Sequence, residues 1–207
     1  MIEISGSHFL SPNKKLRLLS IFLAIHTAPA SSQQTIGQKT HLSSSMVNNY
    51  IKDLKQKGLI YVIGETSKTQ QYYLTSEGKV LLRDLLLSFS AEIVNLYGTV
   101  KRDIAKILQT FYEEGIRTVV LFGVADTAEV VHVAIKNTQL IVIGAVDTDK
   151  AKQGKLFNGF IVQTPEELKK MRPDAIIITS FAKQEEIYVD IKKLIGEEIK
   201  IKKLSDL

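Results

Sequence analysis

Length, composition and charge limit the classes to which this chain can belong. Its 207 residues are 44% hydrophobic and 24% charged and include no cysteine, so disulfides, thiolate metal sites and cysteine catalysis are excluded and two modest globular domains are expected. Apolar runs fall short of the roughly 18 residues of a membrane span, and the N-terminus lacks a secretory pattern, so we expect a cytoplasmic protein without a membrane partner.

The net charge of +5 lies in the first third of the chain. Residues 1–75 carry eight basic and three acidic residues, whereas residues 76–207 carry 19 of each. Excess positive charge attracts the phosphates of nucleic acid whatever the base sequence. A charge run alone more often marks a solvated surface, so its meaning depends on the motif found in the same residues.

Three helices are predicted in this basic part of the chain. Broad apolar spacing over 14–26 indicates a scaffold helix, with its start at Ser11 and Pro12 because proline suits the first helical position. A short polar-faced helix follows over 32–39. A second one, over 43–57, opens at a serine whose hydroxyl can accept an unpaired backbone N–H. The turn between the last two makes this a helix-turn-helix pattern.

Two β-rich runs follow the helices and complete the motif. They cover 59–64 and 70–74 and flank a polar tip at 65–69. Helix, turn, helix and β-hairpin in this order predict a winged helix, whose second helix enters the major groove of DNA. The motif and the positive charge coincide, which favours double-stranded DNA as the partner.

The second helix of the motif has one apolar stripe, formed by Val47, Ile51 and Leu54, and polar side chains elsewhere. The N-terminal residues of such a helix reach base edges, and lysines farther along or on the wing reach phosphates. The candidate DNA-binding residues are therefore Ser44, Ser45, Asn48, Asn49, Lys52, Lys55 and, at the wing tip, Lys68.

The motif resembles the DNA-binding domain of MarR-like prokaryotic repressors. The residues that carry the resemblance are Leu42-Ser43-Ser44-Ser45-Met46-Val47, Leu54, Lys57-Gly58-Leu59-Ile60, Tyr73-Leu74-Thr75 and Gly78-Lys79. Unlike many such proteins, this chain has no arginine on the second helix or the wing. Arginine is the usual bidentate reader of guanine, so we expect modest base discrimination, with adenine favoured through Asn49. Winged helices also mediate protein contacts, which is the alternative role.

Residues 76–115 form a helical connector in this interpretation. A wide apolar face runs along it, continued by Ile104, Ile107, Leu108 and Phe111, and such a face must be buried. Two alternatives are open: packing within the chain, or pairing of two chains into a homodimer, since helix-turn-helix regulators read two half-sites.

Residues 116–207 alternate apolar runs with helical segments. Runs at 119–122, 140–146, 175–179 and 199–204, with a short one at 160–162, predict strands of a parallel sheet covered by helices. The expected fold is thus α/β: a winged helix-turn-helix domain (1–75), a helical connector (76–115) and a Rossmann-like domain (116–207).

Ligands of such sheets bind beyond the carboxyl ends of the strands. The first of these ends resembles the dinucleotide fingerprint G-x-G-x-x-G/A, with Gly123 and Ala128 in place but Ala125 where the second glycine belongs. Asp147 follows the second strand, where an acid can hold a ribose hydroxyl or simply cap a turn. The candidate ligand-binding residues are Gly123, Ala125, Asp126, Asp147 and Thr179.

The order of domains resembles the Rex family of redox-sensing repressors, which implies an NAD(H)-responsive dimer. A second resemblance is to the sugar-nucleotide-binding Rossmann domains that precede acyltransferase domains. It rests on Asp147-Thr148-Asp149-Lys150, Gln153-Gly154-Lys155 and the segment from Gly159 to Leu168. NAD(H) and a sugar nucleotide are thus the two candidate effectors.

Catalytic and metal-binding patterns are missing from the sequence. It has no G-x-S-x-G elbow, P-loop or H-E-x-x-H motif, and its four histidines have no metal-ligand spacing. We therefore expect a non-enzymatic transcription regulator that senses a nucleotide-type effector. The alternatives are a small NAD- or nucleotide-sugar-dependent enzyme with a fused regulatory head, and a winged helix that binds protein.

Overall fold

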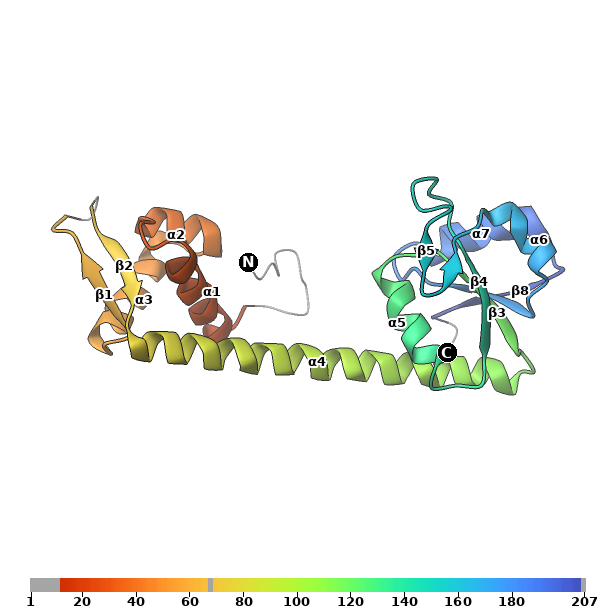
Figure 1. Ribbon diagram of the computed structural model, residues 1–207, viewed down its shortest axis with the longest axis horizontal. Coiled ribbons are helices and arrows are strands. Elements are labelled where there is room, and N and C mark those ends of the chain that lie inside the picture. Colours follow the sequence, from red (N-terminus) through yellow and green to blue (C-terminus); the bar gives the residue numbers. More distant parts are fainter. Residues whose placement is uncertain (1–11, 67–68, 206–207) are drawn as a thin grey trace. The chain divides into compact units, whose positions relative to one another are not determined.

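The computed structural model describes residues 12–66 and 69–205 and shows two compact units, Met1–Val94 and Asn95–Leu207 (Figure 1). The expected order of a winged helix, a helical region and a parallel α/β sheet is confirmed. Among the described residues, no helix is both long and apolar enough to cross a membrane.

The first unit contains three helices, a β-hairpin and the start of a fourth helix. Their bounds are α1 (Lys14–Thr27), α2 (Gln33–Thr40), α3 (Ser44–Gln56), β1 (Ile60–Ile63), β2 (Gln71–Leu74) and α4 (Ser76–Glu113). One apolar core joins α1, α2, α3, both strands and Leu82 of α4. The strands pair antiparallel, with Ile60 opposite Leu74.

Side-chain caps fix the helix starts in this unit. Ser32 and Ser43 accept N–H bonds from Thr35 (3.1 Å) and Met46 (3.3 Å), as expected of N-cap serines. The expected start of α1 at Ser11 and Pro12 is wrong, because the cap is Asn13, whose side chain accepts the N–H of Leu16 at 3.0 Å. Ser11 itself lies outside the described residues.

The connector is one helix of 38 residues, α4. Its first turns pack on the winged-helix core through Leu82, and its last turns pack in the second unit through Ile104, Leu108 and Phe111. Between them lie six exposed large apolar side chains: Leu87, Ile93, Val94, Leu96, Tyr97 and Val100. In the described structure, the middle of the apolar face therefore has no partner.

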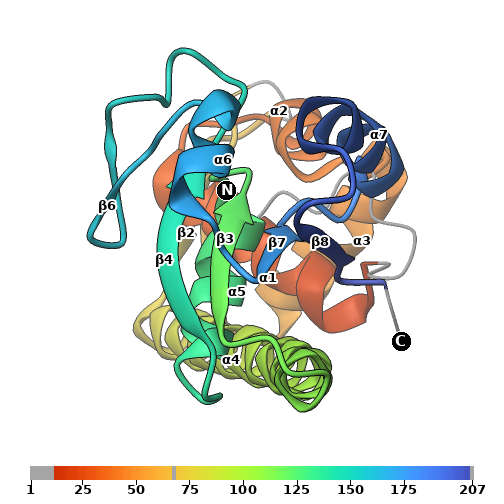
Figure 2. The same ribbon diagram turned by 90° about the vertical axis from the view of Figure 1, so that its right-hand side faces the viewer.

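The second unit is built on a parallel sheet of four strands in the order β4-β3-β7-β8 (Figure 2). Their bounds are β3 (Thr118–Phe122), β4 (Ile141–Val146), β7 (Ala175–Ile178) and β8 (Lys200–Lys203); the helices are α5 (Asp126–Ile135), the 3-10 turn η1 (Pro165–Glu167) with α6 (Leu168–Met171), and α7 (Gln184–Ile195).

Successive strand residues face opposite sides of this sheet. Val119 and Leu121 pack with α5 and the end of α4, whereas Val120 and Phe122 pack with α6 and α7. The last turns of α4 are thus one of the sheet's covering helices. Two cations secure this end: the Arg117 guanidinium lies 3.8 Å from the Tyr112 ring centroid, and Lys202 pairs with Glu114 at 2.6 Å.

One predicted strand has a different role. The run at 160–162 does not join the parallel sheet as a strand of it. Instead β6 (Phe160–Ile161) pairs antiparallel with β5 (Leu156–Phe157) in a small hairpin, which is attached to the sheet through a single bridge between Val146 and Gln163.

Candidate functional sites

The polar face of α3 lies opposite its buried stripe. At about 100° per residue, Val47, Ile51 and Leu54 align on one side and are buried. Of the predicted DNA-binding residues, Ser45, Asn49 and Lys52 are exposed on the opposite side, Ser44 and Lys55 are exposed beside the stripe, and Asn48 is half-buried. Lys68 lies outside the described residues. Six of the seven predicted residues thus lie on α3 outside its buried stripe, spread over about 140° of the helix circumference.

This face carries unpaired positive charge. Asp53, the acid on α3, pairs with Lys57 at 2.8 Å. Among the described residues, Lys52 and Lys55 take part in no ion pair. Their ammonium groups are therefore available to an anionic partner. A phosphate backbone is one such partner.

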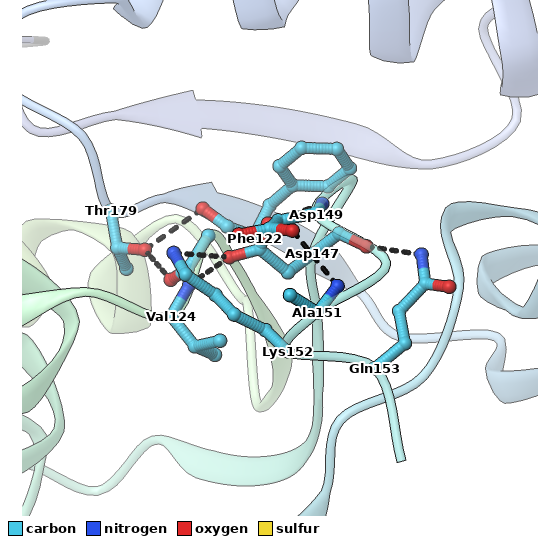
Figure 3. Close-up of polar contacts among 9 residues, drawn as sticks. Phe122, Val124, Asp147, Asp149, Ala151, Lys152, Gln153 and Thr179 are labelled. Atoms are coloured by element: carbon cyan, nitrogen blue, oxygen red, sulfur yellow. Dashed lines mark hydrogen bonds and ion pairs between the residues drawn. The ribbon is translucent and has the colours of Figure 1, made fainter. Parts of the chain in front are cut away.

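The five predicted ligand-binding residues lie at the carboxyl edge of the sheet, where Figure 3 shows two of them, Asp147 and Thr179. Gly123, Ala125 and Asp126 form the turn from β3 into α5, Asp147 follows β4, and Thr179 follows β7. Gly123 has φ +97°, a conformation that favours glycine. Strand ends that are neighbours in the sheet thus bring together residues up to 56 positions apart.

Two of these side chains already have partners within the protein. The Asp147 carboxylate accepts the N–H groups of Val124 (2.7 Å) and Asp149 (2.8 Å) and the Lys152 ammonium (3.2 Å). The Thr179 hydroxyl donates to the backbone carbonyls of Phe122 and Gly123. Both side chains are buried and hold the turn after β3 in place.

The Asp147 carboxyl is an anion at neutral pH. Its burial raises the pKa, but the N–H groups of Val124 and Asp149 and the Lys152 ammonium outweigh burial and hold the pKa below its ordinary value. A buried carboxylate that accepts several N–H bonds behaves in this way. A ribose hydroxyl would have to share this carboxylate with the turn that it holds.

Sequence reasoning missed two residues at this edge. Lys152, five residues after Asp147, brings an ammonium to its carboxylate. Phe181, two residues after Thr179, is 53% exposed. In the sequence, Phe181 could be noticed only as a large apolar residue three positions after the end of β7.

A third missed residue, His132 of α5, is buried against the hairpin. Its ring lies 6.3 Å from the ring of Phe157 and 6.4 Å from that of Phe160. Among the described residues, its Nδ1 atom has no hydrogen-bond partner. Burial, and then the charge of Lys136, lower the pKa of His132 below 6.5, so the ring is neutral at neutral pH.

Because His132 is buried and neutral, the second unit is expected to become less stable as the pH falls. Because its pKa is lower in the folded than in the unfolded protein, its contribution to stability is present above pH 6.5 and is lost as pH falls. Three carboxylates of this unit, Asp147, Glu166 and Asp174, also have lowered pKa values, and their contribution to stability is lost only below the ordinary pKa values of 3.8 for Asp and 4.5 for Glu. Thermal unfolding at pH 7.5 and 5 should show a smaller loss of Tm in His132→Phe than in the original protein. Equal losses would contradict this role.

Two family models match parts of the chain. Residues 15–90 match a model described as winged helix-turn-helix. The first unit is a winged helix-turn-helix domain. Residues 115–202 match a model described as C2185-like, N-terminal. None of the curated proteins matches the chain.

Solved structures of low sequence identity resemble parts of the chain. Staphylococcus aureus MarR in complex with salicylate and kanamycin is 17% identical over 40% of this chain and 56% of that chain, with a TM-score of 0.36. Streptococcus pneumoniae FabT in complex with DNA is 19% identical over 44% and 64%, with a TM-score of 0.34. UDP-D-quinovosamine 4-dehydrogenase from Vibrio fischeri is 16% identical over 42% and 77%, with a TM-score of 0.37. The chain spans a little over half the length of the MarR protein.

Proposed function

We propose that this chain is a homodimeric transcription regulator that binds double-stranded DNA and responds to a nucleotide-type effector held by its α/β unit. The observation that carries the proposal is the face of α3, where serines, asparagines and unpaired lysines lie outside the buried stripe. The net charge of +5 within residues 1–75 supports a phosphate-bearing partner.

DNA binding is tested by its salt dependence. Each lysine that neutralises a phosphate adds about one to the slope of log K against log salt concentration. Lys52→Ala is expected to lower this slope by about one and to weaken binding to all duplexes alike. Fluorescence anisotropy with a labelled duplex, between 50 and 200 mM salt, measures both.

The matched control is Lys193→Ala, which removes an exposed lysine of α7 that pairs with Asp190. It should leave the slope unchanged. Equal slopes for the original protein and Lys52→Ala would remove α3 from the DNA interface. Binding that does not depend on salt would favour a protein-binding role for the winged helix.

Dimer formation is supported by the uncovered middle of α4. Leu86, Phe89, Ile93, Leu96 and Val100 follow one another at alternating intervals of three and four residues, the spacing of a coiled-coil seam. Leu86 and Phe89 pack partly against the winged-helix core, so the exposed part of the seam is Ile93, Leu96 and Val100. Tyr97, 42% exposed, flanks this seam, and Leu87 and Val94, each 65% exposed, lie on a neighbouring face of the same helix. Soluble monomers seldom leave so much contiguous apolar surface in water, and a second copy of α4 supplies a matching one.

The α/β unit supplies the effector site in this proposal. Its carboxyl edge carries Gly123, Ala125, Asp126, Asp147 and Thr179, and edges of this kind bind nucleotides in many parallel sheets. NAD(H) and a sugar nucleotide remain the two candidate effectors. An enzyme acting on either is the second candidate function, and turnover of the bound compound would favour it.

A further inference from the structure

The strand order places a ligand crevice between β3 and β7. When β3, β4, β7 and β8 are numbered 1 to 4 in chain order, their order across the sheet is 2-1-3-4. In open parallel sheets the ligand lies where the order reverses, here at the ends of β3 and β7. The groups that face a ligand there come from the turn after β3, the segment after β7 and the neighbouring loop after β4.

At the usual phosphate position of this edge, a backbone N–H is already bonded to a carboxylate of the protein. In dinucleotide-binding sheets the phosphate lies on backbone N–H groups where the first helix begins. Here the Val124 N–H donates to the Asp147 carboxylate at 2.7 Å. The first turn of α5 also carries two acids, Asp126 and Glu129. A phosphate at this position would meet three carboxylates.

A cation for the phosphate comes instead from the loop after β4. The Lys152 ammonium lies 3.2 Å from the Asp147 carboxylate, and its side chain is 38% exposed although that of Asp147 is 8% exposed. Figure 3 shows the Lys152 side chain crossing the edge beside Val124. Asp147 keeps its two backbone N–H bonds when Lys152 turns outward, so a phosphate can recruit this ammonium without freeing a buried charge.

An exposed aromatic residue follows β7, the neighbour of β3 on the other side from β4. Phe181 follows β7, is 53% exposed and lies between the buried Thr179 and the start of α7. Aromatic rings exposed at ligand sites bind nucleobases by stacking, whichever base is present. Lys152 and Phe181 follow the ends of β4 and β7 by six and three residues, and these two strands are two strand spacings or about 10 Å apart. One nucleotide is about as long as this spacing.

We propose that this edge binds a nucleoside 5′-diphosphate, with its base on Phe181, its ribose over the turn after β3 and its phosphates on Lys152. The proposal rests on the nucleotide-type effector proposed above and specifies how that effector is held. It differs from dinucleotide binding of the fingerprint type because the phosphates face a lysine loop and not the start of α5.

The test compares diphosphates with their nucleosides by isothermal titration calorimetry. UDP and ADP are expected to bind more tightly than uridine and adenosine. Lys152→Gln should remove about tenfold to a hundredfold of diphosphate affinity, the scale of a hydrogen bond to a charged group, and leave the nucleosides unaffected. Lys152→Arg should restore the difference. Phe181→Ala should weaken all four probes about tenfold, and Phe181→Trp should not.

Lys106→Gln is the control, since it also breaks a lysine–aspartate pair, in this case the exposed pair with Asp103 on α4, and should change nothing. Preference for UDP would identify a sugar nucleotide as the effector and preference for ADP a dinucleotide; both support the proposal. Diphosphates that bind equally well to Lys152→Gln or Phe181→Ala overturn this inference alone. If no probe binds the folded protein, both this inference and the proposed nucleotide-type effector are wrong. The proposed DNA binding is tested separately by the salt dependence.

Discussion

Replacing Ile93 and Leu96 by glutamate is expected to convert the proposed dimer into a monomer and to weaken operator binding at least a hundredfold. Both side chains are more than two-fifths exposed and lie on the seam of α4, where a buried unpaired carboxylate is strongly unfavourable. Two linked reading heads bind more tightly than one by a factor of about 10² to 10⁴, and the monomer loses this gain.

Light scattering after size exclusion measures the change. The original protein should have twice the 23.1 kDa chain mass at micromolar concentration and the variant the chain mass itself. Ser88→Glu with Asn95→Glu is the control, since it adds two acids on the opposite side of the same turns of α4. A monomeric original protein, or a double-glutamate variant that remains dimeric, would rule out pairing through this seam.

A second large effect is expected at Gly78, where α4 begins. A Cβ atom at this position would overlap the backbone carbonyl oxygen of Leu59, which also accepts the Thr75 N–H at 3.1 Å. Neither backbone segment can move without disturbing β1 or the start of α4. Gly78→Ala should therefore destabilise the winged-helix unit by about 3 kcal/mol, as overpacking does in cores.

Gly98 provides the matched comparison on the same helix. A Cβ atom there has one neighbour, the Arg102 side chain at 3.5 Å, which is an ordinary contact. Gly98→Ala should thus stabilise the protein by about 0.5–1 kcal/mol through the higher helix propensity of alanine. The free energies of unfolding of Gly78→Ala and Gly98→Ala, measured with urea, test both expectations. A Gly78→Ala protein as stable as the original would mean that the approach of α4 to Leu59 is not close.

The winged helix could be predicted because its signals are local. Val47, Ile51 and Leu54 mark the buried side of α3 at helical spacing, and Ser32 and Ser43 are caps that act within four residues of themselves. The apolar runs that became the central strands β3 and β7 are equally local, since strands buried on both faces are apolar throughout. The edge strand β8 has lysine at three of its four positions and no buried residue.

The hairpin was missed although its signal is present. Asn158 and Gly159 both have positive φ, as the two central residues of a type I′ turn require, and they separate Phe157 from Phe160. Sequence reasoning assigned the run after them to the parallel sheet because an apolar run of three residues does not reveal its partner. Asn-Gly between two phenylalanines was the better indicator.

The ligand edge shows the same limit at the level of side chains. Because Gly123, Asp147 and Thr179 each follow a predicted strand, their place at the carboxyl edge of the sheet could be predicted. Their bonding depends on segments that meet only in the folded chain, such as Lys152 reaching back to Asp147 and the Thr179 hydroxyl reaching the end of β3. A ribose-binding acid and a turn-holding acid look alike in a sequence.

The last turns of α4 set a limit on how this protein can be divided. Ile104, Leu108 and Phe111 are buried under the sheet, and Lys202 of β8 lies over the Phe111 ring at 4.8 Å. A fragment that begins after Gly115 would uncover Val119 and Leu121 and should be insoluble or partly unfolded. Recombination with other sensor modules is therefore expected to be tolerated within the exposed middle of α4, not at the boundary where the first strand begins.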